Sequence, residues 1–134
     1  MKFILMMGMK NDKESEAKGI MTWPKADIQA HIQFMHDFNK QLKDAGEFVA
    51  AEGLAWPAQA KLVAAGKNGA PVTDGVFPES KEFLIGYWII DAENAERAYQ
   101  VAARASAAPG VGGAPLNMPI EVRQIMSGPP EEFA

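Results

Sequence analysis

The chain has 134 residues, carries 13 Lys and Arg against 17 Asp and Glu for a formal net charge of −4, and contains no cysteine. This length predicts a single domain, and the lack of cysteine excludes disulfides, thiolate metal sites and a cysteine nucleophile. The acidic balance argues against a nucleic-acid-binding protein, because such proteins neutralise phosphates with Lys and Arg. No apolar run approaches the roughly 18 residues of a membrane-spanning helix, so no membrane partner is expected.

The first residues predict a strand. The apolar run over residues 3–7 is shorter than the roughly 7–15 apolar residues of a signal peptide, and a buried strand over residues 2–7, ended by Gly8, explains it better. Because other targeting signals are absent, we expect a cytoplasmic location. Residues 9–22 are polar and charged and predict a long, mobile loop.

A helix is predicted from Trp23-Pro24 to about Ala45, since proline suits the first helical turn and Gly46 suits the end of a helix. The apolar residues of this segment recur every three or four positions, which is typical of a helix that packs on one side. They are Ile28, Ile32, Met35, Phe38, Leu42 and Ala45.

Strands are predicted for residues 47–52 and, on either side of a tight turn, for residues 59–65 and 70–73. The turn contains Asn68-Gly69, a strong hairpin signal because both residues tolerate a positive φ.

Residues 83–90 form the most apolar segment and predict a central strand. Asp91 can cap a second helix over residues 92–107, whose many alanines would let it lie close to a sheet. Residues 120–123 alternate between apolar and polar, as an edge strand does, and residues 128–134 are expected to form a flexible tail.

The resulting order is strand, helix, strands, strand, helix, strand over one domain, residues 1–127. It predicts an α+β ferredoxin-like sandwich, with two helices on one face of an antiparallel sheet. No third helix is available for the other face, so we expect a homodimer of the dimeric α+β barrel type, in which two sheets face each other.

Residues 72–82, VTDGVFPESKE, followed by Gly86-Tyr87, resemble the signature of the DGPF (YCII-related) family. Further similarity lies in the first strand and in residues 38–42, 51–54 and 120–125, so the resemblance spans about residues 1–127. It implies a dimeric ferredoxin-like fold in a mostly bacterial, cytoplasmic family that is often linked with genes of extracytoplasmic-function sigma factors. Val76 departs from the family's usual proline, which would fix φ in that turn.

The broader YCII superfamily has a His–Asp pair in a pocket between sheet and helices, and this resemblance implies acid–base chemistry without a cofactor. Both histidines, His31 and His36, fall on the first predicted helix, the former within its apolar stripe and the latter on its flank. Either could be a general base, with Asp74 in the motif as the group that orients it. The alternatives are a hydrogen-bonded structural histidine and a carboxylate that stabilises its Asp-Gly turn. No metal site is expected, because histidines five positions apart diverge around a helix.

A pocket near the motif would use five candidate ligand-binding residues, namely Asn39, Gly75, Phe77, Lys81 and Tyr87. Among them, Asn39 falls in the middle of the apolar stripe, where a polar side chain needs a partner or a cavity. Other aromatic side chains, Trp23, Trp56 and Trp88, could also line such a pocket, although core packing explains Trp88 equally well. Arg97, Arg104 and Arg123 could bind an anionic substrate or lie in solvent.

Two functions remain open. The first is a homodimeric protein with a pocket for a small organic molecule and lyase- or isomerase-like acid–base chemistry. The second is a non-catalytic binding or accessory protein that acts through its dimer surface and is linked to transcription regulation. The sequence leaves open whether the protein is an enzyme and which histidine faces the pocket.

Overall fold

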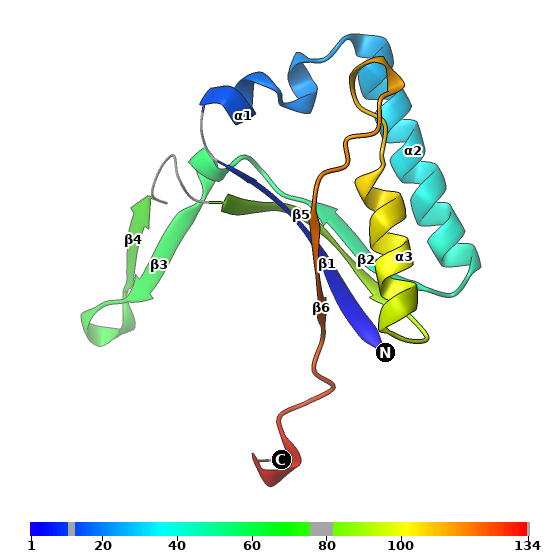
Figure 1. The fold of residues 1–134 in the computed structure, drawn as a ribbon. Helices are drawn as coiled ribbons and strands as arrows, with labels where there is room; N and C mark the ends of the chain where they lie inside the picture. The colour runs from blue at the N-terminus through cyan, green and yellow to red at the C-terminus, as the bar shows by residue number, and fades with distance from the viewer. Residues whose placement is uncertain (11–12, 76–81, 134) are drawn as a thin grey trace.

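An antiparallel four-stranded sheet in the order β2-β5-β1-β6 carries two long helices on one face (Figure 1). This computed structural model describes residues 1–10, 13–75 and 82–133. The strands of the sheet are β1 (Lys2–Lys10), β2 (Phe48–Gly53), β5 (Glu82–Asp91) and β6 (Ile120–Gln124), and the long helices are α2 (Lys25–Asp44) and α3 (Ala95–Ser106). The arrangement confirms the predicted α+β ferredoxin-like sandwich.

The core lies between the sheet and the two long helices. Phe3 and Leu5 of β1 are paired with Ile90 and Trp88 of β5, and all four side chains are buried. The helices contribute Phe38 and Leu42 from α2, and Ala98, Val101, Ala102 and Ala105 from α3. The small residues of α3 let its backbone approach the sheet, as the alanine-rich sequence predicts.

The opposite face of the sheet, here called the open face, is covered by neither α2 nor α3 (Figure 1). At its centre lie Ile4, Met6, Tyr87 and Ile89, in the cross-strand pairs Ile4–Ile89 and Met6–Tyr87. All four are half-buried. Both long helices therefore lie on one face, as predicted, and the dimer stays a prediction.

A separate hairpin of β3 (Lys61–Ala65) and β4 (Pro71–Gly75) projects away from the helices (Figure 1). Asn68 has φ 62° and Gly69 has φ 75°, so the Asn-Gly turn is confirmed. Large apolar side chains of the hairpin are exposed, namely Leu62, Val63 and Val72. A two-stranded hairpin alone is marginally stable in water, so this surface is a candidate contact with other chains.

The described part of residues 9–22 is not the predicted loop. The strand β1 continues past Gly8 to Lys10 through a bulge, and it is followed by α1 (Lys13–Ala17) and a 3₁₀ turn, η1 (Ile20–Thr22). The prediction was wrong because local contacts hold the second half of this segment in a folded conformation. Lys18 Nζ lies 2.9 Å from Glu14 Oε1, and the Thr22 hydroxyl donates to the carbonyl oxygens of Ala17 and Gly19.

The start of α3 also differs from the prediction. Asn94, not Asp91, caps this helix, and its side chain accepts a hydrogen bond from the backbone N–H of Arg97. Asp91 instead ends β5 and pairs with the N-terminal amine of Met1 at 3.0 Å. Asp91 does not cap the helix because residues 92–94 separate it from the first helical turn at Ala95 and its carboxylate is engaged by Met1.

The buried stripe of α2 passes through His31 rather than Ile32. Ile32 is 47% exposed, whereas Phe38 and Leu42 are buried, and Ala45 lies exposed beyond the helix end. His31 is one of the half-buried residues on the inner side. The inner side of the helix therefore includes His31, as its predicted place within the apolar stripe indicates, and excludes Ile32.

Four further 3₁₀ turns complete the described chain, at Pro57–Gln59 (η2), Lys67–Gly69 (η3), Val111–Gly113 (η4) and Glu131–Phe133 (η5). Residues 128–133 are exposed and lead away from the sheet (Figure 1). In the part of the chain that the structure describes, no helix has the length and apolar character needed to span a membrane.

Candidate functional site

A cavity of 690 Å³ lies between the helices and the end of the sheet where β5 begins. Its floor contains Met7 and Met9 of β1 and Ile85 of β5, and one wall contains His31 and Met35 of α2. Other walls come from Leu54 and Trp56, and from residues at and after the end of α3. The volume falls in the usual range for small-molecule sites.

The cavity lies where α3 ends, because this helix is much shorter than the inner strands β1 and β5. Its 12 residues span about 18 Å, whereas the 10 residues of β5 span about 33 Å. The far end of the sheet is therefore left to two other segments. These are the roof segment (residues 13–23) and the segment that leads from α3 to β6.

Gly86 allows Met7 to lie on the floor of the cavity. A Cβ atom at this position would stand 3.0 Å from Met7 Cε and 3.2 Å from the carbonyl oxygen of Glu52. The backbone oxygen is unable to move as a flexible side chain does, so a larger residue would shift the strand. This gives a physical reason for the glycine that precedes Tyr87.

The roof segment is held by its own hydrogen bonds and by one aromatic contact. Trp23 donates its indole N–H to the carbonyl oxygen of Lys18 at 3.0 Å, and its ring meets the His31 ring edge-on, with centroids 5.5 Å apart. Lys18, Thr22 and Trp23 all line the cavity. The contact with His31 thus connects the roof to α2.

His31 has a hydrogen bond that determines its tautomer. Its Nδ1 lies 2.9 Å from the carbonyl oxygen of Pro109. A carbonyl oxygen only accepts, so Nδ1 carries the proton and, in the neutral ring, Nε2 keeps a lone pair. Within the described residues, Nε2 has no hydrogen-bond partner. His36, the other candidate base, is exposed and is not part of the described lining of the cavity.

The segment that holds Pro109 is a folded turn. Pro109 and Pro115 form an isolated bridge, and the N–H of Gly110 donates to the carbonyl oxygen of Ala114 at 2.7 Å. Gly112 and Gly113 have positive φ values, of 67° and 79°. Sequence reasoning missed this partner of His31, since a backbone carbonyl leaves no residue-type signal.

Asn39 and Tyr87 do not reach the cavity. The side-chain oxygen of Asn39 accepts a hydrogen bond from the indole N–H of Trp88 at 2.8 Å. This bond gives the amide oxygen and the indole N–H a partner beside the core. Tyr87 lies on the open face of the sheet, opposite Met6. The partner expected for the polar side chain of Asn39 is therefore Trp88. Neither Asn39 nor Tyr87 is in the described lining of the cavity.

The motif residues lie on the hairpin side of the molecule. Asp74 is exposed on β4, opposite Leu62, and Gly75 ends that strand opposite Lys61. Neither is in the described lining of the cavity, and the hydrogen bond of His31 goes to Pro109. Phe77 and Lys81 lie outside the described residues. The structure thus brings His31 together with Trp23 and Trp56, but not with Asp74.

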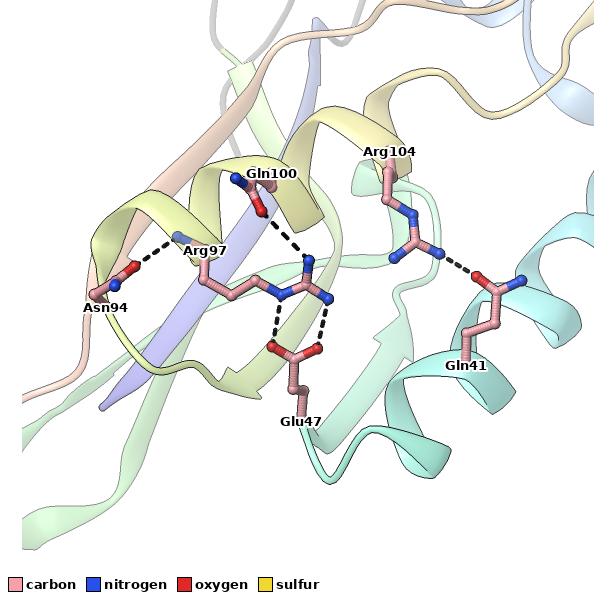
Figure 2. A network of polar contacts seen from close by, with 6 residues as sticks. All are labelled: Gln41, Glu47, Asn94, Arg97, Gln100 and Arg104. Atoms are coloured by element: carbon pink, nitrogen blue, oxygen red, sulfur yellow. Dashed lines mark hydrogen bonds and ion pairs between the residues drawn. The ribbon is translucent and has the colours of Figure 1, made fainter.

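A polar network away from the cavity joins α3 to the end of α2 (Figure 2). Glu47 accepts two hydrogen bonds from the Arg97 guanidinium, at 2.8 and 2.9 Å, and this contact lowers the pKa of Glu47 and raises that of Arg97. Arg104 donates to Gln41 and lies over the Phe38 ring. Arg97 and Arg104 therefore both have partners within the chain.

The described lining of the cavity has few ionisable side chains. In its described lining, only Lys18 and His31 are ionisable, and no carboxylate is present. Throughout the described ranges, no group of three or more acidic or histidine side chains could hold a metal ion. What the arrangement offers is an apolar space with one ring nitrogen able to accept a proton.

A second, smaller hollow of 330 Å³ shares Leu54 and Trp56 with the main cavity.

Comparison with protein families matches residues 1–113 to a family model described as the YCII-related domain. A search of curated proteins found no match. The family match covers the sheet strands β1, β2 and β5, both long helices and the His31–Pro109 contact.

Proposed function

The chain belongs to the YCII-related domain family, and we propose that it binds a small, mostly apolar organic molecule in the cavity beside His31. The observation that carries this proposal is the cavity of 690 Å³, whose described lining has only two ionisable side chains. One of them, Lys18, has a side chain that is 73% exposed and pairs with Glu14, so it stands at the mouth. The interior therefore favours an apolar body over a highly charged one.

Acid–base chemistry is the finer part of the proposal, with His31 as the base. Its Nε2 could take a proton from a bound molecule, while Nδ1–H continues to donate to Pro109. The carbonyl dipole would stabilise the cationic ring that results. Apart from Lys18 at the mouth, the described lining has no second acid or base, so the chemistry supported is a single proton abstraction, as in an isomerase- or lyase-like step.

The alternative, a non-catalytic binding or accessory protein, is favoured by the placement of Asp74. A histidine oriented only by a backbone carbonyl lacks the carboxylate that raises basicity in many catalytic pairs. Turnover assays on ligands found by the binding screen below separate the two. Loss of turnover in His31→Asn with binding retained supports the enzyme, and binding without turnover supports the alternative.

Binding is tested by a thermal-shift screen of a fragment library. Met118 lines the cavity, so Met118→Trp would fill part of it, whereas Met126 is 68% exposed and outside the described lining, which makes Met126→Trp the matched control. We expect ligands that raise the melting temperature of the wild type and of Met126→Trp but not of Met118→Trp. No stabilising ligand, or equal shifts in all three proteins, would rule out the cavity as the binding site.

We also propose a homodimer through the open face. This is supported by the half-buried apolar centre of that face, around Ile4 and Ile89, and by the exposed apolar hairpin. Light scattering at micromolar concentration should give twice the 14.5 kDa mass of the chain. Ile89→Glu should yield monomers, while Gln29→Glu on the exposed side of α2 should not. A wild-type monomer would contradict the dimer.

We also propose a cytoplasmic location, which cell fractionation would test.

A further inference from the structure

The hydroxyl groups that line the cavity donate their protons to the backbone. Thr22 Oγ1 lies 3.0 Å from the carbonyl oxygen of Ala17 and 2.6 Å from that of Gly19, and Ser106 Oγ lies 2.7 Å from the carbonyl oxygen of Met118. A hydroxyl has one proton and two lone pairs. With the proton engaged, each hydroxyl can offer a ligand only an acceptor.

Like these hydroxyls, the neutral His31 ring offers a ligand only a hydrogen-bond acceptor. Its Nδ1–H is engaged by Pro109, so the neutral ring offers the lone pair of Nε2. The indole N–H of Trp23 is likewise engaged, by Lys18. Three polar residues therefore line the cavity as acceptors: Thr22 of the roof segment, His31 of α2 and Ser106 at the end of α3.

Side-chain donors are scarce in the described lining. The Lys18 ammonium is largely exposed and lies 2.9 Å from Glu14 Oε1, so it stands at the mouth. The Trp56 indole N–H is the remaining side-chain donor of the described lining. A carboxylate inside the cavity would lose its hydration without a buried cation in return.

We propose that the ligand is a neutral hydrogen-bond donor on an apolar, aromatic body, of the phenol class, rather than a carboxylate or an ether. This inference rests on the proposed function, since it names the ligand class of the same cavity. The ligand hydroxyl donates to His31 Nε2, and the ring lies among Trp23, Trp56 and the methionine side chains of the floor. Thioethers and indole rings suit an aromatic ligand because they are polarizable.

Three naphthalenes of nearly equal size test the inference, by calorimetry at pH 8, where an imidazole is ordinarily neutral. They are 2-naphthol, 2-methoxynaphthalene and 2-naphthoate. We expect 2-naphthol to bind about tenfold more tightly than 2-methoxynaphthalene, as one hydrogen bond accounts for. We expect 2-naphthoate to bind most weakly.

Two variants assign the preference to His31. In His31→Asn, the amide nitrogen takes the place of Nδ1 and keeps a donor for Pro109, while the acceptor Nε2 is lost. This variant should bind 2-naphthol and 2-methoxynaphthalene equally. The matched control, His36→Asn, changes an exposed histidine of the same helix and should keep the preference. Thermal melting of each variant shows that it is folded.

The outcomes separate the inference from the proposed function. If fragments stabilise the protein through the cavity but 2-naphthol binds no better than the ether, or 2-naphthoate binds most tightly, the ligand class is wrong and the binding function stands. The same holds if 2-naphthol does not bind while other fragments do. A preference that persists in His31→Asn also overturns the inference. If no fragment binds, the proposed function itself is wrong.

Discussion

Replacing Glu47 by glutamine should lower stability and flatten its dependence on acid pH. The Glu47 carboxylate accepts two nearly parallel hydrogen bonds from Arg97, at 2.8 and 2.9 Å (Figure 2). This pair connects the turn after α2 to the first turn of α3. Glutamine keeps the size of the side chain but removes its charge and one of the two acceptors, so the fork is lost.

The magnitude follows from the geometry and the exposure of the pair. Hydrogen bonds to charged groups contribute about 1.5–3 kcal/mol when desolvated. The side chain of Glu47 is 13% exposed but that of Arg97 is 34% exposed, so solvent screens part of the interaction. We therefore expect Glu47→Gln to lower the free energy of unfolding by about 1 kcal/mol at pH 7.

The sign of the pH dependence follows from the lowered pKa of Glu47. Arg97 holds this pKa below its ordinary value of 4.5, so folding is stabilised by the ionised carboxylate above that value. The contribution is lost as the pH falls from 4.5 through the lowered pKa. In Glu47→Gln this loss should be absent.

Urea unfolding followed by tryptophan fluorescence, at one protein concentration and at pH 7 and 3.5, measures both effects. The control is Asp44→Asn, which removes the pair between Lys40 and Asp44 on the exposed side of α2, where the side chains are 74% and 66% exposed. This control should change stability less than Glu47→Gln. Equal effects of the two variants at pH 7, or the same fall in stability with acid in Glu47→Gln as in the wild type, would refute the reasoning.

Other expectations concern the core, the cavity floor and the hairpin. Asn39→Leu leaves the buried indole N–H of Trp88 without its acceptor and should cost about 1–3 kcal/mol in urea unfolding, whereas a retained midpoint would show that the 2.8 Å bond contributes nothing. Gly86→Ala should lower the unfolding free energy by about 1 kcal/mol because its Cβ crowds the strand, while Gly53→Ala, with open space around it, should not; equal midpoints would contradict the crowding. Gly69→Ala, at φ 75°, should speed protease cleavage of the hairpin, and unchanged cleavage would count against strain in this turn.

The fold could be predicted because several independent sequence signals agree. The apolar run over residues 83–90 became the central strand β5, and the Asn-Gly pair became the hairpin turn between β3 and β4. The apolar residues of α2 recur at a helical spacing, and the second long helix is rich in alanine. These elements depend on local backbone preferences and on one buried face. They can therefore be predicted without knowing which distant residues they contact.

The candidate site could be predicted only in part. The apolar stripe placed His31 on the inner side of its helix, and the structure puts this residue in the wall of the cavity. Its hydrogen-bond partner is a backbone carbonyl 78 residues away along the chain, which no residue type reveals. The family motif pointed instead to Asp74, which the structure places on the hairpin.

Helix length set against strand length locates the cavity. The predicted second helix, residues 92–107, would span about 24 Å, and α3 with its 12 residues spans about 18 Å, whereas β5 spans about 33 Å. Because α3 follows β5 and runs back over the sheet, its last residues, Ala105 and Ser106, stop at the wall of the cavity. The roof segment and the segment after α3 close over the uncovered end of the sheet without filling it. The cap at Asn94 lies at the opposite end of α3, so the cavity depends on where this helix ends and not on where it begins.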